Sequence, residues 1–88
     1  MAAAGYPGAY DKGEPIAGIP PESGSGKVFH AGTRLDEQGR VTSDGGRVLC
    51  AVGLGEDLRS AQKKAYRLVA EIDWKTAYFR SDIGFKAL

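Results

Sequence analysis

A stretch near the start of the chain has the glycine spacing of a phosphate-binding loop. Residues 8–13 begin and end with glycine, but a P-loop must continue with a Lys and a Ser or Thr that reach the outer phosphates and the metal. Glu14 and Pro15 follow instead, and a carboxylate at this point repels phosphate. We therefore reject a P-loop and expect either a plain surface loop or a binding loop. In a binding loop, Gly5 would let the backbone approach a ligand and Pro7 would fix the bend.

The single histidine and the single cysteine are the next candidates for chemistry. His30 and Cys50 could pair to form a thiolate nucleophile, but the apolar neighbours of Cys50 disfavour the thiolate, which is the reactive form. We expect Cys50 to be a small core residue, and His30 to be an ordinary strand residue or a polar group that faces a ligand. One histidine is too few for a multi-histidine metal site or a Ser–His–Asp triad. The sequence therefore predicts no catalytic residue and no metal ligand.

Two charged groups remain. Arg80 and Asp82 lie two residues apart beside Gly84, where a tight turn is expected, so they can form a local ion pair or present a charged pair to an anion. The other group lies along a predicted helix and consists of Arg59, Lys63, Lys64 and Arg67. This basic helix face is either solvated or binds nucleic-acid phosphates, although no aromatic residues are interleaved with its charges.

These candidates must be positioned by a small α+β fold. Residues 5–26 are rich in Gly and Pro and predict an irregular loop. An alternating stretch at 28–35, a short strand at 40–43 and an apolar run at 47–54 predict a three-stranded antiparallel meander, with the last strand covered on both sides. The apolar positions of 58–72 share one helical face, and Asp57 is a suitable N-cap. We expect a small antiparallel β-sheet (meander) packed with one main amphipathic α-helix.

Length and composition limit the classes of protein that this chain can belong to. Its 88 residues are enough for a single domain, 1–88, and 42% of them are hydrophobic. The net charge of +1 gives no whole-molecule field that would attract nucleic acid or anionic lipid. The longest apolar run is too short to cross a bilayer, and the start of the chain lacks a secretory pattern. With one cysteine, the chain suits a reducing compartment, and we expect it to be cytoplasmic.

Taken in order, four segments resemble one family. The segments GYPGAYDKGEPIAGIP, KVFHAGTRL, VTSDGGRVLCAVGLGEDLRSAQKKAYRLVAEIDW and YFRSDIGFKAL are similar to the C-terminal domain of the phosphoribosylamine–glycine ligases (glycinamide ribonucleotide synthetases) of the ATP-grasp family. The resemblance covers residues 1–88, and its most specific parts are GYP, VFHAGT, GGRVLCAVGLG and RSDIG. It implies a small β-sheet-plus-helix domain that packs on the rest of a larger enzyme.

The resemblance also implies an activity. Enzymes of this family use ATP and Mg²⁺ (or Mn²⁺) to join glycine to 5-phosphoribosylamine, which gives glycinamide ribonucleotide, ADP and phosphate in de novo purine (IMP) biosynthesis. The family's N-terminal and ATP-grasp domains have no counterpart in these 88 residues. We therefore expect the chain alone to be inactive, to bind no cofactor by itself, and to complete the substrate cleft together with those domains.

The family motifs assign substrate-binding residues. Gly5, Tyr6 and Pro7 match the GYP segment, which in such enzymes lies toward the substrate cleft. Arg80 and Asp82 match R-x-D-I-G, and either shape the floor of the cleft or hold the domain to its neighbour. The H-A-G-T strand is expected to be mostly structural. The alternative is a standalone interaction or nucleic-acid-binding module that uses the basic helix face. A carrier domain is rejected, because neither of the tight turns expected at 36–39 and 44–46 presents a lysine for biotin or lipoate.

Overall fold

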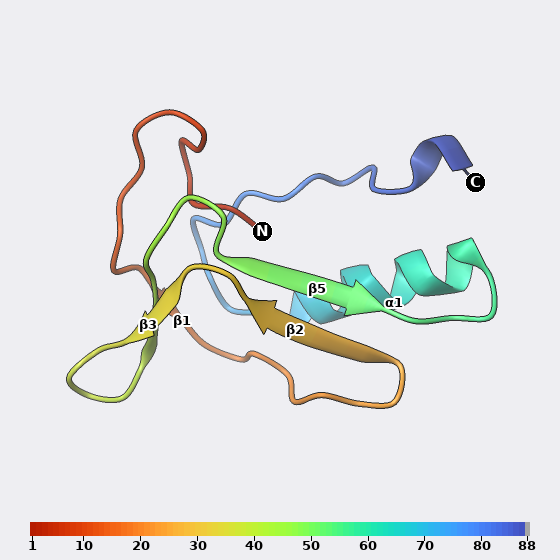
Figure 1. Cartoon of the computed structure of the whole chain (residues 1–88), viewed down its shortest axis with the longest axis horizontal. Helices are drawn as coiled ribbons and strands as arrows, with labels where there is room; N and C mark the ends of the chain where they lie inside the picture. Colours follow the sequence, from red (N-terminus) through yellow and green to blue (C-terminus); the bar gives the residue numbers. More distant parts are fainter. Residues whose placement is uncertain (88) are drawn as a thin grey trace.

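A computed structural model describes residues 1–87 of the chain and confirms the α+β class. The described chain forms five short strands, one α-helix and a terminal 3₁₀ turn (Figure 1). In chain order these elements are β1 (Pro15–Ile16), β2 (Gly26–His30), β3 (Thr33–Leu35), β4 (Val41–Ser43), β5 (Leu49–Gly53), α1 (Leu58–Glu71) and η1 (Phe85–Ala87). Apart from β1 and the start of β2, the glycine- and proline-rich stretch 5–26 forms no long regular element.

The strands form two antiparallel sheets. The prediction of one three-stranded meander is therefore wrong about which strands pair. β2 pairs with β5, whereas β4 lies between β1 and β3 in a separate sheet. The expected strand at 28–35 is divided because the N–H groups of Ala31 and Gly32 both donate to the carbonyl of Val48, at 2.9 and 3.0 Å. Two consecutive amides on one acceptor interrupt the ladder and turn the strand, as at a β-bulge. A Cβ at Gly32 would lie 2.6 Å from the carbonyl oxygen of Arg47.

The β2–β5 sheet is covered by α1 on one face only (Figure 1). The helix approaches closely at Gly53, where a Cβ would lie 2.5 Å from the backbone nitrogen of Ala65. On the opposite face, Phe29 pairs with Cys50, and both are exposed. The predictions that this strand is covered on both sides and that Cys50 is a core residue are therefore wrong. The apolar run at 47–54 did not reveal that only one of its faces is packed.

Helix α1 begins and packs as the sequence predicts. The Asp57 carboxylate accepts a hydrogen bond from the backbone N–H of Ser60 at 2.7 Å, which satisfies one of the free donors of the first turn. Leu68 is buried against the sheet, and Ile72, the C-terminal cap residue, is buried next to it. No helix among residues 1–87 is both long and apolar enough to span a membrane.

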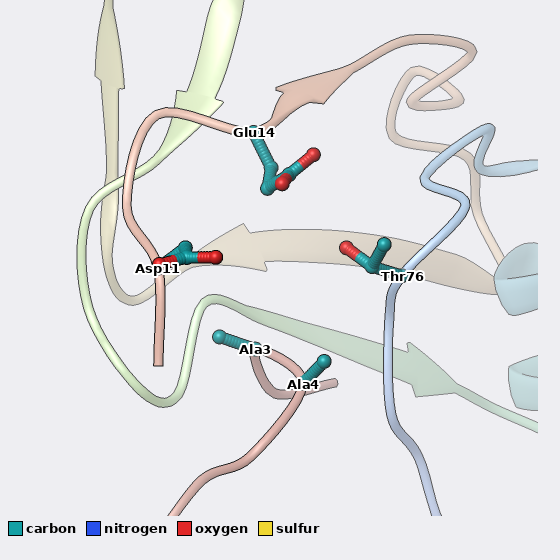
Figure 2. Close-up of a pocket in the computed structure, with 5 residues that line it drawn as sticks. All are labelled: Ala3, Ala4, Asp11, Glu14 and Thr76. Carbon is teal, nitrogen blue, oxygen red and sulfur yellow. The ribbon is translucent and has the colours of Figure 1, made fainter. Parts of the chain in front are cut away.

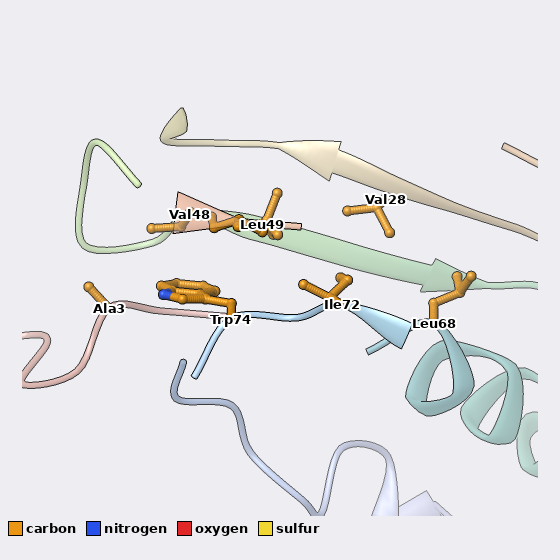
Figure 3. Close-up of a cluster of buried hydrophobic side chains, with 8 residues drawn as sticks. Ala3, Val28, Val48, Leu49, Leu68, Ile72 and Trp74 are labelled. Atoms are coloured by element: carbon orange, nitrogen blue, oxygen red, sulfur yellow. The ribbon is translucent and has the colours of Figure 1, made fainter. Parts of the chain in front are cut away.

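One hydrophobic core joins the helix, both sheets and the start of the chain. Figure 3 shows most of this cluster, in which the indole ring of Trp74 lies between Ala3 and Ile72. Its buried members are Ala3, Ile16, Val28, Val48, Leu49, Leu68, Ile72 and Trp74. Ile16, one of the few large aliphatic residues of the irregular loop, anchors this loop to the core.

A backbone bridge holds the first residues next to the last segment. The N–H of Ala2 donates to the carbonyl of Tyr78 at 2.7 Å, and the N–H of Tyr78 donates back to Ala2 at 2.8 Å. Ala2 also forms an antiparallel bridge with Arg47. The N-terminal segment thus lies between two others that are distant in sequence (Figure 1). This arrangement determines where the two predicted substrate-binding segments emerge.

Candidate functional site

The Gly5–Tyr6–Pro7 bend depends on a backbone shape that glycine permits. Gly5 has φ +92°, and a Cβ on it would overlap the carbonyl oxygen of Ala9. The bend is closed by the N–H of Tyr6, which donates to the carbonyl of Ala3 at 3.1 Å. Within the bend, the peptide bond between Tyr6 and Pro7 is cis. The bend is therefore an ordered turn that emerges directly from the core residue Ala3.

The Tyr6 ring packs directly against a second glycine, Gly46. A Cβ at Gly46 would lie 2.5 Å from Cε2 of Tyr6, so only a residue without a side chain lets the ring lie there. The Tyr10 ring is tilted against Tyr6, with 6.2 Å between ring centroids. Gly46 thus has a packing role as well as a place in a glycine-rich turn, which the local sequence alone did not reveal.

A small cavity of about 60 Å³ lies beside this bend (Figure 2). It is lined by Ala3, Ala4, Asp11, Glu14 and Thr76, and the side chains of the last three extend toward one another across it. Two carboxylates and a hydroxyl offer acceptors for donor groups such as an ammonium, and they disfavour phosphate. None of these was predicted from the sequence as a site residue. Thr76 is far from the other four in sequence, and only the tertiary fold brings it to the cavity.

The backbone holds Glu14 firmly at this cavity. Its N–H donates to Oγ of Ser43 at 3.1 Å, and its carbonyl accepts from the N–H of Ser43 at 2.9 Å. Ser43 is fully buried at the end of β4. One wall of the cavity is therefore fixed to the β1–β4 sheet, while the others come from the start of the chain and the segment after Trp74.

Arg80 and Asp82 form the ion pair that their spacing allows. Nε of Arg80 lies 3.0 Å from Oδ1 of Asp82, and a second guanidinium nitrogen lies 3.1 Å from Oδ2, so the contact is bidentate. The side-chain hydrogen bonds from Arg80 lower the pKa of Asp82, and the same bonds raise the pKa of Arg80. Both side chains are exposed. They line an open depression of about 350 Å³ together with residues 83–86.

Helix α1 holds the backbone on either side of this ion pair. The Tyr66 hydroxyl donates to the carbonyl of Arg80 at 2.5 Å and accepts from the N–H of Ile83 at 3.0 Å. Nε2 of Gln62 donates to the carbonyl of Ile83 at 2.7 Å. Sequence reasoning missed Tyr66 and Gln62, because both lie inside the helical pattern and no local signal shows what their side chains reach.

The two predicted substrate-binding segments are connected by the Ala2–Tyr78 bridge but do not share a cavity. The bridge is antiparallel, so the chain runs from Ala2 to Gly5 in one direction and from Tyr78 to Arg80 in the other. The cavity beside the first bend and the depression beside Arg80 have no lining residue in common. The described domain thus presents two separate bends.

Other candidates have local partners or form no site. Nδ1 of the exposed His30 lies 2.8 Å from Oγ1 of Thr33, so its partner is within the H-A-G-T segment itself. Within residues 1–87, no three or more His, Cys, Asp or Glu side chains are grouped so that they could hold a metal ion. The N-terminus of α1, where a phosphate could bind, already has the Asp57 carboxylate as its cap.

Comparisons with known proteins agree with this fold. The family model of the phosphoribosylglycinamide synthetase C domain matches residues 1–86. The chain is 51% identical to a phosphoribosylamine–glycine ligase of Salmonella typhimurium and 49% identical to that of Escherichia coli; all of the chain aligns, and it covers 21% of each relative. A crystal structure of the Thermotoga maritima ligase matches with a TM-score of 0.78 and 38% identity over 92% of this chain and 19% of that one. The chain spans about a fifth of the length of these relatives, and it belongs to the phosphoribosylglycinamide synthetase C-domain family.

Proposed function

We propose that this chain acts as the C-terminal domain of a phosphoribosylamine–glycine ligase. Such an enzyme joins 5-phosphoribosylamine and glycine at the expense of ATP, and gives glycinamide ribonucleotide, ADP and phosphate for purine biosynthesis. The observation that carries the proposal is the match of the C-domain family model to residues 1–86, with 51% identity to a ligase of that name along the entire chain. The partner of this domain is then the remainder of the ligase, and its compartment is the cytoplasm.

The described residues do not fit ATP and Mg²⁺ or Mn²⁺, so we assign these cofactors to the rest of the enzyme. Nucleotide phosphates require clustered cations and backbone N–H donors around them, and their metal requires several oxygen ligands. The cavity beside the first bend is small and lined by two carboxylates, and the N-terminus of α1 is capped by Asp57. In this proposal the domain completes the substrate cleft and is not catalytic by itself.

We propose Gly5, Tyr6 and Pro7 as substrate-binding residues. The bend that they form is ordered by its own backbone hydrogen bond and by the packing of Tyr6 on Gly46, so it can meet a ligand without first folding. The acceptor groups of the neighbouring cavity suit an amine, and both small substrates of the reaction carry one. These two features support a substrate contact at the bend.

We also propose Arg80 and Asp82 as part of the substrate site. A guanidinium has five N–H donors, and the ion pair with Asp82 uses two nitrogen atoms, so donors remain for a further acceptor. The pair is exposed on one side of the bend and hydrogen-bonded to α1 through the backbone on the other. The pair can therefore face the other domains of the ligase while its hydrogen bonds keep the two side chains in place.

The proposal is tested by comparing the chain alone with a complete ligase that contains it. Residues 1–88 are joined to the rest of the Salmonella typhimurium ligase, of which the matching region is 21%. We expect ADP release that depends on both glycine and 5-phosphoribosylamine from the joined protein, and none from the chain alone. Calorimetric titration of the chain with ATP should show no binding. An inactive but folded joined protein, or micromolar ATP binding by the chain alone, would contradict the proposal.

The same preparations decide the alternative of a nucleic-acid-binding module. Binding through the basic helix face would produce a mobility shift of RNA or DNA by the chain at low salt, and the shift would weaken steeply as salt rises. We expect no shift. A salt-dependent shift together with an inactive joined protein would favour the alternative.

A further inference from the structure

The bend that carries Arg80 and Asp82 is held to the domain by hydrogen bonds more than by packing. All residues from 78 to 86 are exposed, so no buried side chain anchors this bend. Within it, the N–H of Phe85 donates to the carbonyl of Asp82 at 3.0 Å. The contacts from α1 therefore determine how the bend is oriented on the surface.

The Tyr66 hydroxyl is placed to control this orientation because it contacts the backbone of Arg80 and that of Ile83, the residue after Asp82. It donates to the carbonyl of Arg80 and accepts from the N–H of Ile83, so one oxygen connects two residues that lie on either side of Asp82. The Tyr66 ring also lies against Phe79, with 6.4 Å between ring centroids. These contacts restrict the bend at three residues, Phe79, Arg80 and Ile83.

Gln62 adds a fourth contact from the same side of the helix. It lies four residues before Tyr66, so the two side chains are neighbours on one helical face. Its side-chain amide donates to the carbonyl of Ile83, whose N–H is already bound to Tyr66. Both backbone groups of Ile83 are thus bound by side chains of α1.

We infer that Tyr66 and Gln62 are positioning residues for the ligase reaction, which hold the Arg80–Asp82 pair in the orientation that substrate binding requires. This inference rests on the proposed function. The hydrogen bonds of the Tyr66 hydroxyl are to the backbone of the bend, so it acts through Arg80. Its removal should therefore weaken binding of the same substrate that depends on Arg80, with little change in the chemical step.

The first test is kinetic and uses the complete ligase that carries residues 1–88. Tyr66→Phe removes the hydroxyl and keeps the ring that contacts Phe79. We expect this variant to raise KM about fivefold, as the loss of a hydrogen-bonded anchor does, for the substrate whose KM Arg80→Ala also raises, with kcat nearly unchanged. Tyr78→Phe is the matched control, because Tyr78 is exposed and is held through its backbone hydrogen bonds to Ala2, and the KM of this variant should not change.

The double variant separates positioning from a general structural role. If Tyr66 acts only through Arg80, then adding Tyr66→Phe to Arg80→Ala causes no further loss of kcat/KM. A structural role would lower kcat/KM by the same factor in both backgrounds, and that result would overturn the inference. An unchanged KM for Tyr66→Phe beside a raised KM for Arg80→Ala would also overturn it, and would leave the proposed function intact.

Hydrogen exchange provides a readout that does not depend on activity. The Tyr66 hydroxyl is the acceptor for the N–H of Ile83, so Tyr66→Phe should speed exchange of this amide while amides in the middle of α1 stay protected. Unchanged exchange at Ile83 would refute the positioning role. Faster exchange together with an unaffected Arg80→Ala enzyme would instead remove Arg80 from the proposed substrate site, and the inference would fall with it.

Discussion

Replacing Gly5 by Ala tests whether the first bend depends on the absence of a side chain. Gly5 has φ +92°, and an added Cβ would overlap the carbonyl oxygen of Ala9. Gly13 is the matched control, because its φ is +84° and an added Cβ would meet no atom within 4 Å. Both variants carry the backbone strain of a left-handed residue, so Gly5→Ala alone adds the steric overlap.

The expected changes in the free energy of unfolding follow from the backbone strain and the steric overlap. A left-handed conformation costs an L residue about 1–2 kcal/mol, and the smaller freedom of unfolded Ala offsets about 0.4–1 kcal/mol of that cost. Gly13→Ala should therefore lower the free energy of unfolding by about 0–1.5 kcal/mol. Relief of a steric overlap costs about 1–3 kcal/mol more, so Gly5→Ala should unfold at least about 4 °C lower than Gly13→Ala.

Urea and thermal unfolding of the two variants can be followed through Trp74, which is buried and is the only tryptophan. Equal losses for Gly5→Ala and Gly13→Ala would refute the steric argument, because the two positions differ in their surroundings and hardly in φ. A second measurement is the kcat/KM of Gly5→Ala in the complete ligase. If Gly5→Ala unfolds at a lower temperature but retains full kcat/KM, then the bend is needed for folding alone and leaves the proposed substrate site.

Three further predictions concern stability. Asp57→Ala removes the cap of α1 and should cost about 1 kcal/mol in urea unfolding, whereas Asp57→Asn should cost clearly less; equal losses would contradict a capping role. Leu68→Ala empties a buried position between α1 and the sheet and should cost about 2–5 kcal/mol, while the exposed Leu35→Ala should change little. Hydrogen bonds from backbone N–H groups, that of Arg40 foremost, lower the pKa of Asp36 in the folded state. Its stabilising contribution is then complete above the ordinary carboxyl pKa and is lost as pH falls through the lowered value, so Asp36→Asn should flatten the acid limb of a stability–pH curve, and an unchanged limb would refute this.

The helix was predictable because its signals are local. The cap at Asp57 and the spacing of the apolar positions in 58–72 depend on neighbours within a few residues, and the structure has α1 there. The Arg80–Asp82 pair was predictable for the same reason, since its partners are two residues apart. Interactions between residues this close in sequence can be predicted without knowledge of the rest of the chain.

The division of the first long strand was not predictable from its own residues. It depends on the carbonyl of Val48, which accepts from both Ala31 and Gly32 after a loop has returned the chain. The exposure of Cys50 was missed for a similar reason. An apolar run shows that burial is possible on either face, and only the position of α1 decides that the Phe29–Cys50 face stays open.

The antiparallel Ala2–Tyr78 bridge leads to a last prediction, which is that the two bends act independently of each other in the complete ligase. Extended chain covers about 3.3 Å per residue, so Gly5 and Arg80, three and two residues from the bridge in opposite directions, can be as much as about 16 Å apart. At that separation one small substrate, such as the glycine of the proposed reaction, would contact one bend only. Gly5→Ala and Arg80→Ala should therefore have independent effects, and their losses in kcat/KM should add to within about 0.5 kcal/mol in the double variant of the complete ligase. A coupling above about 1 kcal/mol would mean that both bends contact one substrate group, and the open arrangement of this domain would then have to close when the rest of the enzyme is present.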